Sequence, residues 1–204
     1  MTVRPMGNSR AYPVFRTTDA AEAYRQAKRL CALLEHIDDA TWLFAVMRTP
    51  SEVRAMAELV PEGSFEYDDF RTDPATGDLL RFDLDVTTLD DAELATHLPL
   101  SFTEDVVRGD GTVEERFLAA LGEGVAAMEW NGRWPDDPEI DSLGHWNHDG
   151  VQIVFHGDEA QYGDTWTEDH TVFVHVTKYG DPERAQKLAA HIGSEVLGEE
   201  QLGW

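Results

Sequence analysis

The chain is poor in cysteine and in lysine. Of its 204 residues one is a cysteine, Cys31, and three are lysines, Lys28, Lys178 and Lys187. A single cysteine excludes an intrachain disulfide and a zinc site built from several cysteines. Long apolar runs are also missing, since the longest, Trp42 to Met47, is far too short to cross a bilayer and none near the start resembles a signal peptide. These absences predict a soluble, cytoplasmic protein in which Cys31 is a small core residue.

Positive charge is scarce as well. Sixteen Lys and Arg side chains stand against 40 Asp and Glu, which gives a formal net charge of −24. Such a balance opposes binding to nucleic acids and to anionic membranes, because both need cations from the protein. It favours a basic partner, a divalent metal, or plain solubility in a salt-adapted protein. The net charge is −8 over residues 1–102 and −16 over residues 103–204, and this asymmetry favours a functional acidic face.

The pattern of apolar residues predicts an α+β fold. Capping residues and apolar stripes predict helices over about 18–37, 49–60, 90–97, 113–130 and 181–196. Alternating or unbroken apolar runs predict strands over about 42–47, 65–68, 82–86, 99–107, 151–155 and 171–179, the fourth of them at a sheet edge. We therefore expect a mixed or mainly antiparallel sheet of about five to six strands with four to five helices packed on it.

The breaks in this pattern suggest how the chain is divided. Pro5, Gly7 and Pro13 predict an extended N-terminal arm over residues 1–17. Residues 18–197 contain no linker long enough to force a boundary, so we expect a single α+β domain. Residues 198–204 are expected to form a flexible tail.

One stretch, from Trp134 to Thr177, has a distinct chemical character, because its 44 residues include no Lys and no Arg. Its ten carboxylates are Asp136, Asp137, Glu139, Asp141, Asp149, Asp158, Glu159, Asp164, Glu168 and Asp169. Five of the eight histidines lie here: His145, His148, His156, His170 and His175. Residues 156–170 form a loop longer than most hairpin connections, and such loops are often functional.

Imidazole and carboxylate groups together are the ligand types of a borderline divalent metal. His145, His148, His156 and His170 are the candidate metal ligands, with Asp158 or Glu159 as a general base on a metal-bound water. The spacing is not that of a His-Glu-x-x-His helix, and no helix is expected here. The alternative is a set of surface histidines on acidic loops.

His175 lies on a predicted strand and shares a face with Phe173 and Thr177, whereas Val172, Val174 and Val176 share the other. It is either a hydrogen-bonded, half-buried histidine or a catalytic one. Nearby carboxylates favour imidazolium, so these histidines are candidates for a proton-linked switch.

The sequence contains no phosphate-binding glycine loop, no serine nucleophile elbow and no kinase pattern. We therefore favour a binding protein over an enzyme. Its acidic, aromatic surface over about 134–170 is expected to meet a basic protein partner, as an immunity-type or inhibitor protein does when it neutralises a basic effector. The expected contact residues are Trp146, Asp149, Asp158, Glu159, Tyr162, Asp164, Trp166, Glu168 and Asp169. The alternative is a metal-dependent hydrolase that uses the histidines; the sequence leaves the oligomeric state open.

Overall fold

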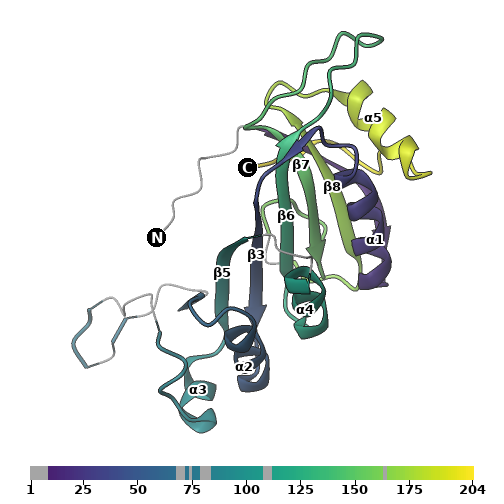
Figure 1. Cartoon of the computed structure of the whole chain (residues 1–204). Coiled ribbons are helices and arrows are strands. Elements are labelled where there is room, and N and C mark those ends of the chain that lie inside the picture. Colours follow the sequence, from purple (N-terminus) through teal and green to yellow (C-terminus); the bar gives the residue numbers. More distant parts are fainter. Residues whose placement is uncertain (1–8, 68–71, 74, 79–83, 108–111, 163–164) are drawn as a thin grey trace.

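The chain is built around one antiparallel β-sheet (Figure 1). The computed structural model describes residues 9–67, 72–73, 75–78, 84–107, 112–162 and 165–204. The strands are β1 (Ser9–Thr17), β2 (His36–Ile37), β3 (Ala40–Met47), β4 (Ser64–Tyr67), β5 (Leu100–Val107), β6 (Ala126–Arg133), β7 (Asp149–Phe155), β8 (His170–Thr177) and β9 (Gln201–Leu202). The helices are α1 (Ala20–Cys31), α2 (Pro50–Leu59), α3 (Asp91–His97), α4 (Thr112–Ala120) and α5 (Pro182–His191).

The sheet has the strand order β4-β5-β3-β6-β7-β8-β1-β9, and β2 pairs with one end of β6. All pairings between these strands are antiparallel. The α+β class expected from the sequence is therefore confirmed. The described residues form five helices, but their nine strands exceed the five to six that we expected. In the described part of the chain, no helix is long and apolar enough to span a membrane.

Helix α1 covers one face of the central strands. Its N-cap is Asp19, whose side chain accepts a hydrogen bond from the Glu22 amide, as the spacing predicts. The helix buries Ala23, Ala27, Leu30 and Cys31 and contacts β1, β7 and β8. Helix α5 packs beside it against β1 and β8. Burial of these apolar stripes is the main force that holds the helices on the sheet.

Helices α2, α3 and α4 gather at the other end of the molecule (Figure 1). Thr49 and Glu52 form the predicted capping box at the start of α2. Asp90 and Glu93 form another at the start of α3. In each capping box the side chain of the first residue accepts the backbone N–H of the third helical residue, and the glutamate side chain accepts the backbone N–H of the first. Both helices therefore begin where the sequence predicts.

One buried carboxylate ties α4 to α1 and to the sheet. Glu114 accepts hydrogen bonds from Tyr24 (2.7 Å), Lys28 (2.8 Å), Thr41 (3.1 Å) and Trp130 Nε1 (2.7 Å). Burial alone would raise the pKa of Glu114, but the hydrogen bonds from Lys28, Trp130 and Tyr24 outweigh it and lower that pKa. Glu114 is therefore a satisfied, charged anchor of the core.

The opposite face of β7 and β8 is covered by two irregular segments, residues 156–162 and 197–204. Ala160 and Tyr162 pack with a small cluster of buried residues on this face: Ala11, Val125, Val154 and Phe173. Both faces of the central strands are thus covered, which is why each residue of β7 is buried.

The helix expected over 113–130 was wrong in its second half. Helix α4 ends at Ala120, and Ala126–Arg133 form β6 between β3 and β7. A side chain on Gly124 would overlap the Val46 carbonyl oxygen, so the chain passes this point only as glycine. The apolar residues that resembled a helical stripe are instead those of a strand covered on both faces.

The expected ends of the chain also need correction. Residues 9–17 are extended, as expected, but they form strand β1 of the sheet, paired with β8 and β9, whereas residues 1–8 lie outside the described residues. Residues 201–202 are not loose, because they form β9. Strand β5 is not an edge, since it lies between β4 and β3. Part of the strand expected at 82–86 falls outside the described residues, and residues 84–86 are not a strand.

Candidate functional site

The histidines of the acidic stretch do not converge on one point. His145 and His148 precede β7, with ring centroids 5.9 Å apart. His156 and His170 meet beyond its other end, with centroids 4.7 Å apart. A seven-residue strand separates the two pairs by about 20 Å, at 3.3 Å per residue. Among the described residues no group of three or more His, Cys, Asp or Glu side chains is arranged to hold a metal ion.

At the far end of β7, His170 is buried and His156 is half-buried beside an exposed tryptophan. His156 donates its backbone N–H to His170 Nδ1 at 3.1 Å, and the Trp166 ring stacks on the His156 ring at 5.5 Å. Burial, and then the neighbouring His156, lower the pKa of His170 to about 4. His170 is therefore neutral at pH 7 and serves as a hydrogen-bond acceptor inside this corner.

Asp149 was expected on the surface but is 1% exposed. Its carboxylate accepts the backbone N–H groups of Trp134 (3.0 Å) and His145 (2.7 Å). Burial raises the pKa of Asp149 to about 6, although these two amides and Arg184 act in the opposite direction. The side chain therefore fastens both ends of the loop between β6 and β7 and cannot touch a partner directly.

The other expected contact residues divide between the two ends of the sheet. Trp146 is 51% exposed beside the start of β7, whereas Trp166 is 46% exposed beyond its end. Tyr162 is half-buried and stacks on Phe44 at 4.7 Å. The carboxylates near Trp166 are Asp158, Glu159, Glu168 and Asp169, of which Glu159 and Glu168 are exposed, while Asp164 lies outside the described residues. The stretch thus presents two separate acidic, aromatic sites rather than one.

The end near Trp146 also has a cavity. Its volume is about 260 Å³, and it lies between the end of α1, the loop and α5. The lining residues are Leu33, Trp134, Pro135, Asp136, Asp137, Arg184, Lys187, Leu188 and His191. The floor is mainly apolar and the rim is charged, which is the usual composition of a site that receives one side chain or a small ligand.

Arg184 holds the wall of this cavity in place. Its guanidinium donates to Pro135 O (2.8 Å), to Ser142 O (2.8 Å) and to Ser142 Oγ (2.6 Å). Asp181 is the N-cap of α5 and lies 3.7 Å from the same guanidinium. The loop is therefore fixed to α5 by a buried, fully bonded cation, and the cavity is preformed.

The acids on the rim are held in the charged form. The backbone N–H of Gly144 and the charge of Arg133 lower the pKa of Asp136. The ammonium of Lys187, which donates at 2.7 Å, lowers the pKa of Asp137. Both rim carboxylates therefore stay ionised at neutral pH.

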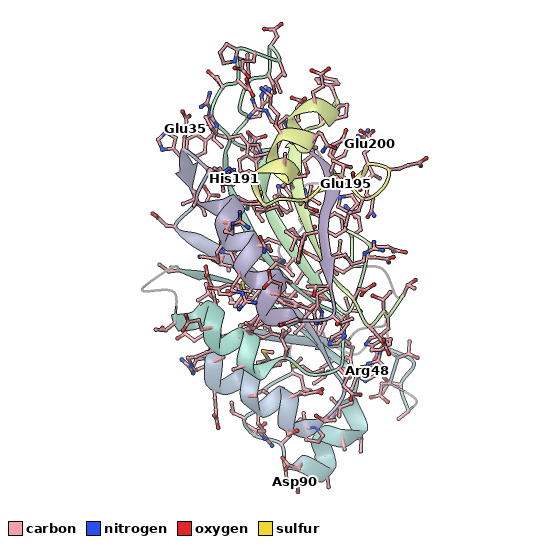
Figure 2. All side chains as sticks on the ribbon, turned by 90° about the vertical axis from the view of Figure 1, so that its right-hand side faces the viewer. Glu35, Arg48, Asp90, His191, Glu195 and Glu200 are labelled. Carbon is pink, nitrogen blue, oxygen red and sulfur yellow. The ribbon has the colours of Figure 1, made fainter. Side chains whose placement is uncertain are left out.

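Trp146 belongs to the same surface as the cavity. Its ring stacks on His36 at 4.9 Å, and Arg133 joins Glu35, next to His36, to Asp136 on the rim. Figure 2 shows Glu35 and His191 towards the end of the molecule where this loop projects. We call the cavity and its neighbours the β6–β7 loop surface, whose residues outside the cavity are Glu35, His36, Asp39, Glu139, Leu143 and Trp146.

A separate buried chain of polar side chains crosses the face opposite to α1. Ser9 Oγ lies 2.9 Å from His175 Nδ1, His175 Nε2 lies 3.0 Å from Gln152 Oε1, and Gln152 Nε2 donates to Glu129 Oε1 at 3.0 Å. Gln152 Nε2 also donates to Ala160 O at 2.9 Å. Because Gln152 offers only its oxygen to the imidazole, His175 carries its proton on Nε2 and accepts from Ser9 at Nδ1.

His175 is therefore a fully buried, hydrogen-bonded residue. The strand faces expected from the alternation are confirmed, since the opposite face of β8 buries Val172, Val174 and Val176 in the main core. Burial raises the pKa of Glu129 well above its ordinary range, so the far end of the polar chain is neutral. Sequence reasoning found His175 but missed Gln152 and Glu129, which join it only through strand register.

Comparison with protein-family models, with curated proteins and with solved structures finds no match for this chain.

Proposed function

We propose that the protein is an acidic interaction protein that binds a basic protein partner through the β6–β7 loop surface. One observation carries this proposal. The exposed Trp146 lies on the same β6–β7 loop as Asp136 and Asp137, the ionised carboxylates that line the cavity. Large aromatic anchors next to pockets dominate the affinity of many interfaces, and the surrounding carboxylates would steer a cationic partner towards them.

The distribution of ion pairs supports an attraction to cations. Most described Lys and Arg side chains already have a carboxylate partner. The pairs are Arg10–Glu200, Arg16–Asp158, Arg25–Glu22, Lys28–Glu114, Arg54–Asp91, Arg133–Glu35, Arg133–Asp136, Arg184–Asp181, Lys187–Asp137 and Lys187–Glu139. With a net charge of −24, many carboxylates are left without such compensation, and they generate a negative potential around the molecule.

The concrete form of this function is that of an immunity-type or inhibitor protein in the cytoplasm. Such a protein covers the working surface of a basic effector and needs no catalytic group of its own. The apolar part of a partner side chain would contact Leu33 and Leu188 in the cavity. A Lys or Arg side chain of the partner would compete with Arg133 and Lys187 for Asp136 and Asp137 at the rim.

Two matched variants test which surface binds. The first combines Trp146→Ala with Asp39→Lys and Glu139→Lys at the β6–β7 loop surface. The second combines Trp166→Ala with Glu159→Lys and Glu168→Lys at the other end of β7. Both remove one exposed tryptophan and raise the net charge equally, so a difference between their affinities reports which surface binds the partner.

The partner is first captured on the wild-type chain from an extract, and its affinity for the three proteins is then measured by calorimetry. We expect the first variant to bind about 30-fold more weakly or worse, because truncation of an anchoring tryptophan typically costs about 2 kcal/mol. The second should stay within a few-fold of the wild type. Equal losses of affinity in the two variants would show that binding depends only on the net charge. A loss of affinity confined to the second variant would show that the partner binds near Trp166 instead.

The metal-dependent hydrolase is the alternative. Its four ligands would have to come from His145, His148, His156 and His170, which form two pairs at opposite ends of β7. His170 Nδ1 is already occupied by the His156 amide. A metal would therefore have to assemble from one pair and groups not now beside it.

A further inference from the structure

Residues 197–204 lie along the outer edge of β1 in the way that a bound peptide adds a strand to a sheet. Within β9, Leu202 is opposite Arg10 and Gln201 is opposite Ala11. Further backbone hydrogen bonds run from Leu197 N–H to Pro13 O (2.8 Å), from Gly203 N–H to Ser9 O (3.0 Å) and from Ser9 N–H to Trp204 O (2.9 Å). Binding by strand addition takes its affinity from such bonds and its specificity from pockets for side chains.

Individual side chains of this segment make specific hydrogen bonds to the rest of the protein. The Glu200 carboxylate accepts from Tyr12 OH at 2.6 Å. Gln201 Oε1 accepts from Ala160 N–H at 2.8 Å, and Gln201 Nε2 donates to Asp158 O at 3.0 Å. Both ends of the glutamine amide are thus satisfied by backbone groups of the 156–162 segment. This is recognition of a particular side chain, not general packing.

Trp204 fills a slot with flat walls. Its ring lies on the His175 ring with centroids 3.4 Å apart and planes 15° apart. A Cβ on Gly150 would come within 2.7 Å of the Trp204 ring, and a Cβ on Gly203 would overlap Ser9 Oγ. His175 cannot turn away, because Ser9 and Gln152 hold its two nitrogens. The slot is therefore preorganised for a planar ring that follows a glycine.

Apart from that ring, the segment contributes little to the core. Leu197 is 44% exposed and Leu202 is 56% exposed. Short edge segments with few buried apolar contacts open at a lower free energy than the rest of a fold. The segment therefore binds β1 through the contacts that a peptide ligand makes, and it is expected to detach from β1 at a lower free energy than that of global unfolding.

We propose that the outer edge of β1 and the His175 slot together form a binding site for an extended acidic peptide with a Gly-Trp pair, and that residues 200–204 occupy this site in cis. The charge of the edge fits such a peptide. Arg10 lies on β1, 3.5 Å from Glu200 of the segment. The slot opens on the face of the sheet opposite to α1, whereas the cavity lies between α1 and α5, and the site does not depend on the function proposed above.

The test uses the full-length chain with the single change Trp204→Ala, which leaves the slot empty. The probe is a synthetic peptide with the sequence of residues 196–204, added in trans and followed by calorimetry. We expect it to bind the variant with a micromolar Kd and to bind the wild type at least tenfold more weakly. In the wild type the tethered segment competes at a millimolar effective concentration.

Matched controls distinguish binding in the slot from nonspecific binding of the peptide. Trp146→Ala removes a tryptophan elsewhere and should behave as the wild type. A peptide with alanine in place of its tryptophan should not bind Trp204→Ala, because nothing in it would fill the slot. Equal binding to the wild type and to Trp204→Ala, no binding to Trp204→Ala up to millimolar peptide, or equally strong binding of the peptide without its tryptophan would overturn the proposal.

A measurement on the unaltered chain covers the case in which Trp204→Ala does not fold. Native-state hydrogen exchange compares the Gly203 amide, bonded to Ser9 O, with the amides in the middle of β8. We expect the Gly203 amide to exchange at least a hundredfold faster, through local release of the segment. Exchange of both only by global unfolding would show that the segment is a permanent part of the fold and would end the proposal.

Discussion

At the scale of single residues, buried ionisable groups act in opposite directions. His170 has its pKa lowered from 6.5 to about 4, whereas Asp149 has its pKa raised from 3.8 to about 6. Between pH 4 and 6.5 the histidine is protonated in the unfolded chain but neutral in the folded one. His170 therefore lowers the free energy of unfolding as the pH falls. Between pH 4 and 6 the folded Asp149 holds a proton that the unfolded one has lost, so its contribution decreases as the pH rises.

Replacing His170 separates these opposed contributions. In His170→Asn the amide oxygen still accepts the His156 N–H, but the titrating ring is gone. The free energy of unfolding of the wild type relative to this variant should fall by roughly 3 kcal/mol between pH 7.5 and pH 4, the amount that corresponds to the change in the pKa of His170. Urea unfolding followed by tryptophan fluorescence measures this difference.

The comparison above pH 7.5, where the imidazole is neutral in both states, gives the pH-independent effect of the substitution. A difference that stays constant from pH 7.5 to pH 4 would show that His170 is not held in the neutral form.

At the scale of elements, the sequence predicted the helices that begin with a local capping signal. Asp19, Thr49, Asp90 and Asp181 cap α1, α2, α3 and α5 as the sequence indicates. Strands β1, β2, β6 and β9 were missed because they are defined by partners far along the chain. In β1, for example, Ser9 is the strand partner of Thr177. Strand β6 is covered on both faces, so it has no alternation that would separate it from a helix.

The candidate site shows the same limit. The sequence identified Trp146 and the acids of its loop, because a stretch without Lys or Arg is visible locally. It did not identify the cavity, whose wall depends on Arg184 and Lys187 from α5 and on Leu33 after α1. Asp149 was placed on the surface because nothing in its neighbourhood indicates that its carboxylate turns inward to two amides.

Gly124 decides where α4 gives way to β6. In Gly124→Ala the new Cβ would overlap the Val46 carbonyl oxygen, next to the hydrogen bond from Val46 N–H to Val125 O. We expect the chain to lose at least about 2 kcal/mol of stability, because backbone of two paired strands must move apart. Thermal and urea unfolding measure the loss.

Gly198→Ala is the matched control for this substitution. Its Cβ would meet only Pro13 Cγ, at an ordinary 3.6 Å. The stability of this variant should stay within about 0.5 kcal/mol of the wild type. Equal stabilities for the two variants would show that the close approach at Gly124 is not a constraint on the fold.

At the scale of the whole molecule, the charge and the fold work together. The antiparallel sheet separates the acidic stretch into two exposed sites, one at each end of β7, and the loop that carries Trp146 also forms a wall of a cavity. Most Lys and Arg side chains in the described part of the chain pair with carboxylates of the same chain, and the net charge is −24. This arrangement is suited to meeting a basic surface at one defined place.

The most direct test is the hydrogen-exchange footprint of the complex with the captured basic partner. Exchange is compared for the free and the bound chain at equal salt. We predict that protection appears in residues 134–148 and 35–39, which carry the β6–β7 loop surface, while residues 156–169 exchange as in the free chain. Protection centred on residues 156–169, or an equal change along the whole chain, would contradict the assignment of the partner to this surface.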